Sequence, residues 1–249
     1  MPSQTNSFLN WLSSLAIGLR EVCNPTAVCS CCGARLSGSE IGVCQTCVAS
    51  LPSTGFEAWA QNPVKERMDG RVPLVAAFSS FYFHKGESLR KLIHRFKYSG
   101  DQLTARDLGR EMGRRATAAG IANIYDAIIP VPLHKSRLRH RGYNQSLLLA
   151  QGFSDVTGIP VLTDIPVLTD ILLRHQSAQT QTHLSAVERY LNVQGDFSLG
   201  KNASSARGKT LLLIDDVFTT GATSEACLET LNKIDGVRLG LATLAYASS

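Results

Sequence analysis

The sequence predicts an α/β protein in which helices cover both faces of a parallel sheet, preceded by a small metal-binding module. Two observations predict the sheet: the short apolar runs 127–131 and 211–214 suit strands buried on both faces, and a polar loop and a helical pattern follow each run. A third observation predicts the module, because six of the seven cysteines lie between Cys23 and Cys47.

Length and charge set the outer limits. The 249 residues suit one medium domain and a small one. A formal net charge of +5 fits a phosphate-rich partner without proving one. No basic residue precedes Arg20, so the start lacks the charged end of a signal peptide. The apolar stretch Phe8–Leu19 is also shorter than the ~20 residues that a membrane span needs. We therefore expect a cytoplasmic protein without a membrane span.

Apolar spacing predicts the amino-terminal elements. Residues 1–22 carry an amphipathic helix over Phe8–Leu19, which is expected to pack on the rest of the protein rather than on a membrane. Residues 51–71 are rich in proline and glycine and are interpreted as an irregular connector. After the connector we expect a strand over Val75–Phe83 and helices over Leu89–Phe96 and Leu103–Ala118.

The remaining elements are expected to alternate between strand and helix. They are the strand at 127–131, a basic loop, a helix over Tyr143–Phe153, the strand Leu211–Ile214, a helix over Ala222–Ile234 and a closing strand over Val237–Tyr246.

The sequence also contains a tandem duplication: Ile159–Asp164 recurs immediately as Ile165–Asp170. A single extra copy is not the repeat of a solenoid, so we interpret it as lengthening a loop or an edge strand.

The cysteine spacing indicates a metal site. Cys29 and Cys32 form one Cys-x-x-Cys pair, and Cys44 and Cys47 form a second, eleven residues later. Four thiolates at this spacing can enclose one tetrahedral Zn²⁺, and such pairs without a secretion signal indicate a reducing compartment. The segment has little apolar core, so the metal would supply most of its folding energy. No histidine belongs to the set, so we expect a structural zinc site. A redox role is the alternative, and Cys23 and Cys31 stay unassigned.

A second site is predicted where the strand 211–214 ends in two acids, Asp215 and Asp216. Backbone N–H groups of the small hydroxyl-rich loop that follows, with the helix it opens, suit a phosphate. The acids can accept hydrogen bonds from vicinal ribose hydroxyls, directly or through hydrated Mg²⁺. A capped turn without a ligand is the alternative, and the absence of a Walker A lysine argues against a P-loop NTPase. The loop residues are Thr219, Thr220, Gly221, Ala222 and Thr223.

The loop after the strand at 127–131 is strongly basic. Such a cluster repels itself unless it is solvated or faces an anion, so pyrophosphate or nucleic acid are the functional alternatives to a solvated loop. Tyr143 near the arginines could stack on a base. His94 and Lys97, on a predicted amphipathic helix, are interpreted as packing or surface residues. The basic residues are His134, Lys135, Arg137, Arg139, His140 and Arg141.

The acidic segment resembles the PRPP-binding motif of type I phosphoribosyltransferases, which have apolar residues, two acids and then Thr-Thr-Gly-x-Thr. That resemblance implies that Asp215 and Asp216 face the ribose 2′- and 3′-hydroxyls, and that Thr219 to Thr223 hold the 5′-phosphate. Some purine-salvage members carry an acid at the position of Thr219. Its absence here argues against a hypoxanthine-guanine-type enzyme.

The wider pattern resembles the ComF family, which joins a phosphoribosyltransferase-like domain to an amino-terminal zinc ribbon. The resemblance runs from about residue 25 to the end, and the tandem copy before Arg174 departs from it. It rests on Pro130-Val-Pro-Leu133 with the arginines that follow, on Arg141-Gly-Tyr-Asn-Gln145, on Phe96-Lys-Tyr-Ser-Gly100, and on Arg174, Thr180, Gln181, Leu184, Arg189, Asn192, Gly195 and Phe197.

This resemblance implies a domain order and two rival functions. The expected order is an amino-terminal helix (1–22), a zinc ribbon (23–50), a connector (51–71) and a phosphoribosyltransferase-like domain (72–249). Family members are associated with natural transformation, which implies PRPP with Mg²⁺, single-stranded DNA and other DNA-uptake proteins as partners. The first hypothesis is an enzyme that transfers phosphoribosyl from PRPP and releases pyrophosphate. The second is a binding protein, since a fold does not fix an activity. Arg174, Arg189 and Asn192 could belong to a loop that closes over pyrophosphate; the alternative for Arg189 and Asn192 is a structural role as caps or ion-pair partners.

Overall fold

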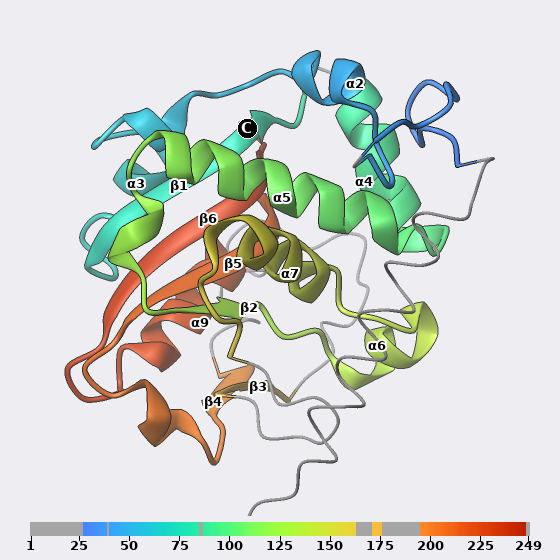
Figure 1. Cartoon of the computed structure of the whole chain (residues 1–249). Coiled ribbons are helices and arrows are strands. Elements are labelled where there is room, and N and C mark those ends of the chain that lie inside the picture. The colour runs from blue at the N-terminus through green and yellow to red at the C-terminus, as the bar shows by residue number, and fades with distance from the viewer. Residues whose placement is uncertain (1–26, 39, 85–86, 163–170, 176–194, 248–249) are drawn as a thin grey trace, which may run out of the picture.

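A four-stranded parallel sheet forms the centre of the computed structural model (Figure 1). The strand order is β1 (Leu74–Tyr82), β6 (Arg238–Tyr246), β5 (Thr210–Phe218) and β2 (Ala127–Pro130). Both β5 and β6 are buried along almost their whole length, which explains their unbroken apolar sequences. The predicted parallel sheet is confirmed, with the closing strand inserted between β1 and β5.

The structure describes residues 27–38, 40–84, 87–162, 171–175 and 195–247. The predicted helix Phe8–Leu19, the second copy of the repeat, Arg189 and Asn192 lie outside these ranges. The described helices are α2 (Gln45–Ala49), α3 (Pro63–Met68), α4 (Glu87–Tyr98), α5 (Gln102–Ala118), α6 (Lys135–Arg141), α7 (Gln145–Thr157) and α9 (Ala222–Leu231), with 3₁₀ turns η1 (Phe56–Ala58), η2 (Ala122–Ile124) and η3 (Ala203–Ala206).

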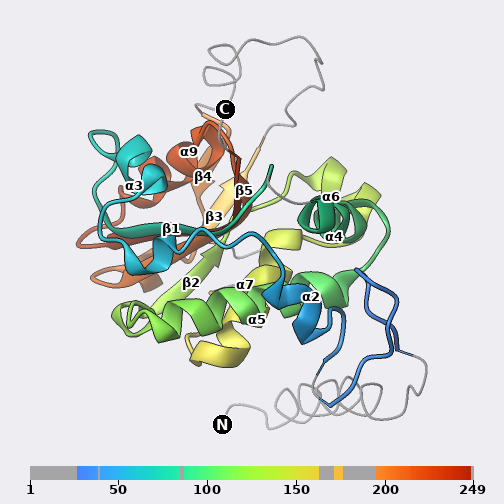
Figure 2. The ribbon, with the colours of Figure 1, turned by 90° about the horizontal axis from the view of Figure 1, so that it is seen from above.

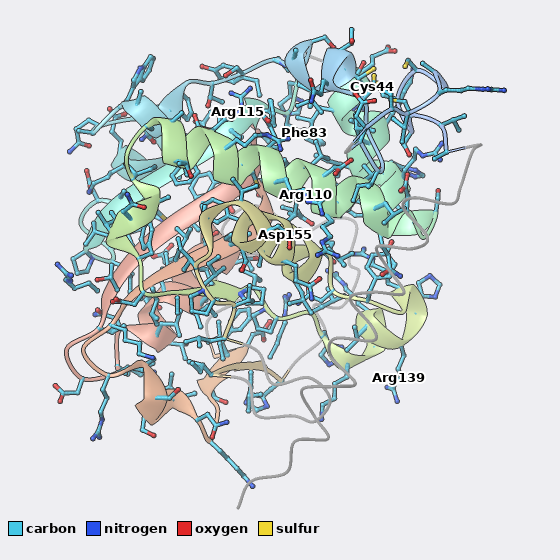
Figure 3. All side chains as sticks on the ribbon, in the orientation of Figure 1. Cys44, Phe83, Arg110, Arg115, Arg139 and Asp155 are labelled. Carbon is cyan, nitrogen blue, oxygen red and sulfur yellow. The ribbon has the colours of Figure 1, made fainter. Side chains whose placement is uncertain are left out.

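Helices cover both faces of the sheet, as the sequence predicted. Figure 2 shows α5 and α7 together on one face and α9 on the other. Asp155 on α7 links the two helices of the first face (Figure 3). Its carboxylate forms ion pairs with two arginines of α5, Arg106 with an N–O distance of 2.8 Å and Arg110 with 3.0 Å. Among the described residues, no helix is long and apolar enough to cross a membrane.

The segment 51–71 is more ordered than the predicted irregular connector. It contains η1 and α3, and α3 has a strong start, since the Asn62 side chain accepts from the Val64 and Lys65 backbone N–H groups. The same side chain is buried and donates to the Ala77 carbonyl at 2.8 Å, which fastens α3 to β1. Proline and glycine in this segment therefore mark helix starts and turns rather than an unstructured link.

Two smaller pairings complete the fold. β3 (Leu172–Arg174) and β4 (Phe197–Leu199) form an antiparallel pair that packs against α9. Beside β2, Val161 forms a parallel bridge with Ile128, so the first copy of the repeat continues the sheet at its edge. The first copy therefore begins as edge structure, one of the two arrangements that the sequence suggested.

Candidate phosphoribosyl site and metal centre

The two acids of the predicted site are buried at the carboxyl end of β5. Asp215 accepts two hydrogen bonds on one oxygen: the Ser146 hydroxyl donates at 3.0 Å and the Asp216 backbone N–H at 2.8 Å. Ser146 lies in the first turn of α7 and is fully buried. The carboxyl ends of parallel strands are where α/β proteins bind ligands, so the acids stand at the expected edge of the sheet.

Lys97 was expected to be a packing or surface residue, and the structure corrects this. It lies near the end of α4, and its Nζ is 2.8 Å from Asp216 Oδ2. Asp216 is buried and Lys97 half-buried, so this ion pair is shielded from water better than a surface pair. The interpretation failed because the pair joins two elements far apart in sequence, which the spacing along one helix does not report.

The surroundings of Asp215 favour its neutral form. Burial and the neighbouring Asp216 charge raise the pKa of Asp215 to about 7, although the Asp216 N–H, Lys97 and Ser146 oppose the rise. A buried carboxyl that titrates near neutral pH is a frequent mark of a functional site. Here the cause is visible in the fold: two adjacent acids and one lysine share a single buried corner.

The loop after β5 turns sharply into α9. Gly221 has φ +84° and precedes the first helical residue, and a Cβ at that position would approach the Phe218 ring to 2.9 Å. Thr219 and Thr220 are exposed, and Thr223 is half-buried in the first turn of α9. The loop backbone is tied down from outside, since Arg67 of α3 donates to the Thr219 carbonyl at 2.9 Å. The loop thus carries exposed threonines and the N-terminus of α9 directly after the strand that bears the acids, and the Thr220 hydroxyl accepts the Ala222 backbone N–H at 3.4 Å.

An ion pair from Arg71, three residues after α3, forms a second contact between this segment and α9. Its guanidinium lies 2.6 Å from Glu225 Oε2, and the Glu225 side chain is almost completely buried in the first turn of α9. The segment 51–71 and the residue just beyond it therefore hold both the loop and the helix that opens after it. The sequence did not predict that this segment holds the loop and α9, because an irregular connector was not expected to contact the site.

The predicted basic loop is a short helix, α6, and His134 is its N-cap. His134 Nδ1 accepts from the Ser136 N–H at 3.1 Å, and Gly142 ends the helix. No residue of α6 is buried, so the helix lacks the apolar stripe that would have predicted it. Figure 3 shows Arg139 pointing away from the body of the protein. Within the described residues, no ion pair joins α6 to a carboxylate.

The segment after α6 connects it to the acidic site. The Tyr143 hydroxyl donates to the Phe96 carbonyl in α4, and the Asn144 side chain donates to the Val131 carbonyl at 3.0 Å. Two residues further on, Ser146 reaches Asp215. The Tyr143 hydroxyl is therefore bound to α4, and the stacking of its ring on a base stays a prediction. The structure brings the predicted acids and α4 together with this segment, while α6 itself projects to one side.

Arg174 is part of the β3–β4 pair and is largely buried. Its guanidinium carbon lies 5.2 Å from the centroid of the Phe197 ring, and its NH2 lies 3.8 Å from Asp196 Oδ2. Burial raises the pKa of Asp196, while Arg174 and His134 oppose that rise. These contacts hold Arg174 within the β3–β4 pair, and its expected role in closing over pyrophosphate stays a prediction.

The four predicted metal ligands come together at the other side of α4. The Sγ atoms of Cys29, Cys32, Cys44 and Cys47 all lie within 4.8 Å of one another, and those of Cys32 and Cys44 are 3.8 Å apart (Figure 3). Tetrahedral Zn²⁺ with Zn–S bonds of about 2.3 Å requires sulfur atoms about 3.8 Å apart, so the donor set fits this metal. The cluster can hold a metal ion.

Backbone donors add to the metal-binding character of the cluster. The Cys31 and Cys44 N–H groups point to Cys29 Sγ at 3.4 and 3.3 Å. Burial alone would raise the pKa of Cys29, but these N–H groups and that of Cys32 outweigh it and lower the pKa to about 7. Burial beside the other thiols raises the pKa of Cys47. A divalent cation would reverse the preference of Cys47 and stabilise four thiolates together.

The cysteine module, defined here as the described residues from 27 to 50, is fastened to α5. One carboxylate oxygen of Asp107 accepts the backbone N–H groups of Ile41, Gly42 and Val43 at 3.2, 2.7 and 3.1 Å. A Cβ on Gly42 would lie 2.6 Å from the Thr104 backbone nitrogen, so only glycine permits this approach. The module therefore sits on the larger domain in one fixed position.

Comparison with known proteins agrees with this geometry. A model of the phosphoribosyl transferase domain matches residues 148–249. Competence protein F of Haemophilus influenzae is 36% identical over 154 residues, which cover 61% of this chain and 65% of that protein. The DNA utilization protein YhgH of Salmonella typhimurium is 29% identical over 223 residues, 86% of each chain. These similarities support membership of the ComF family. The chain has a type I phosphoribosyltransferase fold, which agrees with the resemblance drawn from its motifs.

Two further facts describe how much of the chain and of its relatives these similarities cover. Its match spans slightly less than two thirds of the length of the Haemophilus protein. Among solved structures, the glutamine phosphoribosylpyrophosphate amidotransferase from B. subtilis, in complex with ADP and GMP, is 20% identical with a TM-score of 0.34. That match covers 55% of this chain and 25% of the other.

Three residues of the site were not predicted from the sequence. Lys97 belongs to the Phe96–Gly100 motif that carried the family resemblance, and Ser146 directly follows the Arg141–Gln145 motif. The available signal was thus membership of a motif for Lys97 and a position next to a motif for Ser146. Arg67 had no such signal, because its contact is with a backbone carbonyl and depends only on how α3 is placed.

Proposed function

We propose that this protein binds PRPP with Mg²⁺ at the end of β5 and handles single-stranded DNA during DNA uptake. The observation that carries the first half is the buried Asp215–Asp216 pair with Lys97 on Asp216, placed directly before the Gly221 turn and α9. Acids for ribose hydroxyls, hydroxyls for phosphate and a cation between them are the groups that a phosphoribosyl pyrophosphate requires.

Each part of the proposed site has a defined task. The exposed hydroxyls of Thr219 and Thr220, the Thr223 hydroxyl and the N–H groups that start α9 bind the 5′-phosphate. Asp215 and Asp216 accept the ribose hydroxyls. Mg²⁺, when bound with PRPP, supplies positive charge to the pyrophosphate. Lys97 already places an ammonium on Asp216, which supports the view that this carboxylate accepts a cation. Gly221 and Ala222 shape the turn so that the phosphate approaches the backbone.

The names of the relatives support the second half of the proposal. Competence protein F and the DNA utilization protein YhgH have names that refer to competence and to the use of DNA. In this chain, α6 offers cations to phosphates, chiefly Lys135, Arg137, Arg139 and Arg141, with His134 at its start. Such contacts bind a nucleic-acid backbone without regard to sequence.

The cysteine module completes the proposal as a structural zinc site. Cys29, Cys32, Cys44 and Cys47 supply the four sulfur ligands, and the spacing of their Sγ atoms supports zinc. Their closed set leaves no position for a substrate. Paired thiols that remain free in the fold also support a reducing, cytoplasmic location.

The test is a calorimetric titration of the protein with PRPP and Mg²⁺. Asp216→Ala removes an acceptor for ribose or hydrated Mg²⁺, and a lost hydrogen bond to a charged group costs about 1.5–3 kcal/mol. We expect about tenfold to hundredfold weaker binding. Thr223→Val should weaken phosphate binding while the Mg²⁺ dependence remains. Glu229→Ala, an exposed acid on the same helix α9, serves as the matched control and should bind as the parent does.

The titration, followed by an assay for pyrophosphate release, distinguishes binding from catalysis. Circular dichroism must show that each variant is folded. If folded Asp215→Ala and Asp216→Ala bind PRPP as tightly as the parent, the site assignment is wrong. If the parent binds PRPP, a pyrophosphate-release assay over a panel of bases follows. Release with one base would establish the alternative function, an active phosphoribosyltransferase in base or nucleotide metabolism.

A further inference from the structure

A cavity of about 670 Å³ opens beside the proposed phosphoribosyl site, between α4 and the end of β5. Lys97, whose ammonium pairs with Asp216, and Thr219 of the phosphate loop both line it. The rest of its wall combines aromatic rings and cations with two apolar residues and one acid, Glu87, which is paired with Lys91. On such a wall a base can stack while the cations contact phosphates. The lining residues used below are Arg90, Lys91, His94 and Tyr98.

Tyr98 is the most accessible aromatic ring at this cavity, with 67% of its surface exposed. Its ring centroid lies 4.9 Å from that of His94, at an interplanar angle of 44°, and the Arg141 guanidinium carbon lies 5.5 Å from it. Two neighbours thus fix a ring that is otherwise in solvent. An exposed aromatic held in place loses little conformational entropy when a base stacks on it.

The backbone beneath Tyr98 is also fixed. Phe96, two residues earlier, is fully buried, and its carbonyl accepts the Tyr143 hydroxyl. Lys97, directly before Tyr98, is held by Asp216. By donating its hydroxyl to α4, Tyr143 supports the end of the helix that presents Tyr98. Tyr98 is a second candidate for stacking on a base, beside Tyr143, and it is the more exposed of the two.

The cations around Tyr98 differ in their pairing. On α4, Lys91 lies 3.6 Å from Glu87, and Arg95 lies 3.2 Å from Asp101. On α6, by contrast, no ion pair with a carboxylate occurs within the described part of the chain. Arg141 donates to the Gln145 side chain and lies over Tyr98, while the other cations of α6 have no carboxylate partner among the described residues. Such cations next to an exposed ring match a strand whose phosphates and bases follow one another at short intervals.

We propose that Tyr98, backed by His94 and Arg141, is the base-stacking platform of a single-stranded DNA path that leads from α6 to the cavity beside Thr219. This inference rests on the proposed handling of single-stranded DNA and gives it a location. It brings a base of the strand within reach of the phosphoribosyl site, so that the two proposed ligands of the protein meet at one end of the sheet.

The test compares three variants by fluorescence anisotropy with a labelled oligo-dT strand. Stacking on an aromatic ring is worth about 1–3 kcal/mol per base, so Tyr98→Ala should weaken binding about tenfold. Its salt dependence should stay unchanged, because no phosphate contact is lost. Tyr98→Phe keeps the ring and should bind within about twofold of the parent. Trp59→Ala removes another exposed aromatic, 54% exposed and far from α6, and should change nothing.

The outcomes separate this inference from the proposed function. If Tyr98→Ala binds the strand like the parent while the α6 substitutions Arg137→Ala, Arg139→Ala and Arg141→Ala abolish binding, DNA handling stands and the platform is wrong. A parent that binds no oligo-dT sinks both. If Tyr98→Ala also loses PRPP binding, it acts by displacing Lys97, which overturns the platform.

Two additional measurements test the path itself. Ultraviolet cross-linking of an oligonucleotide that carries 5-iodouracil, followed by mass spectrometry, should identify Tyr98 as an attached residue. Competition with dTMP should require a far higher concentration than competition with the oligonucleotide, because a single nucleotide reaches only the platform. Equal competition per nucleotide would instead mean a mononucleotide pocket, and it would overturn the strand path.

Discussion

The cysteine module and α6 are both short segments without a core of their own, yet the protein treats them in opposite ways. The module is closed around four sulfur atoms and clamped from outside by Asp107, which accepts three of its backbone N–H groups. α6 buries no residue and is held at its ends, by the His134 cap and by Arg141 against Tyr98.

This difference distinguishes charged groups that stabilise the fold from charged groups that remain available to bind a partner. The carboxylate of Asp107 is buried and its hydrogen-bonding capacity is used inside the fold. Of the α6 cations, Arg141 contacts Gln145 and Tyr98, whereas Lys135, Arg137 and Arg139 form no ion pair among the described residues, and the mutual repulsion of the cluster opposes folding. A cluster that costs stability and is kept at the surface is the better candidate for binding a partner, whereas the module is the better candidate for positioning α5.

The largest effect should come from removing a metal ligand. Parent protein should contain about one zinc per chain, and Cys44→Ser should lose it, because structural zinc supplies roughly 10–16 kcal/mol in small cysteine modules. Metal analysis gives the zinc content, and hydrogen exchange reports whether residues 27–50 lose protection. Cys31→Ser, a neighbouring thiol outside the four, is the matched control and should keep the metal. Parent protein that contains no zinc after growth in zinc-replete medium would refute the site.

The next largest effect should follow from breaking the clamp. Asp107→Ala leaves three backbone N–H groups without their acceptor, and we expect a loss of about 3 kcal/mol in the free energy of unfolding. Urea denaturation measures it. Glu87→Ala, which removes an exposed acid paired only with Lys91, should cost less than about 0.5 kcal/mol. Equal costs for the two variants would show that the module is not held by Asp107.

On the other side of the comparison, α6 should be dispensable for folding. Replacing Arg137, Arg139 and Arg141 together with Ala should change the free energy of unfolding by no more than about 0.5 kcal/mol, as is usual at exposed positions. The same variant should bind oligo-dT more weakly and with a flatter salt dependence, because fewer counterions are released. An unchanged slope and affinity would remove α6 from DNA binding and leave it a solvated helix.

A separate, pH-dependent effect concerns a second buried acid, Asp215, which accepts two hydrogen bonds where Asp107 accepts three from the cysteine module. The pKa of Asp215 is raised to about 7, so the folded state holds this proton more tightly than the unfolded state, whose value is near 4. The resulting stability is present below pH 4 and is lost as the pH rises through 7. Asp215→Asn carries no charge, so it should gain stability relative to the parent between pH 5 and pH 8. Denaturation curves at both pH values test this, and a constant difference would contradict it.

Local patterns predicted what depends on local chemistry. The runs at 127–131 and 211–214 became β2 and β5, because strands buried on both faces must be apolar throughout. The paired acids and the four cysteines were found because their spacing alone carries the chemistry. α3 was missed although Asn62-Pro63 is a helix-start signal, since the surrounding glycines and prolines outweighed it.

What the sequence could not predict depends on contacts between distant segments. The position of β6 between β1 and β5 follows from packing, which chain order does not state. The pairing of Lys97 with Asp216 spans more than a hundred residues. α6 was predicted as a loop because helix prediction relies on an apolar stripe, and a helix with no buried residue has none.

The segment 143–146 sets a strict limit on length. Within four consecutive residues, Tyr143 reaches α4, Asn144 reaches the residue after β2, and Ser146 reaches the acid at the end of β5. These three hydrogen bonds hold the segment to three different elements, so the number of residues between them is fixed. Inserting or deleting one residue here would rotate the following turn of α7 by about 100° and carry the Ser146 hydroxyl away from Asp215. The protein can therefore vary the length of the segment after β2 only before Tyr143, within or ahead of α6.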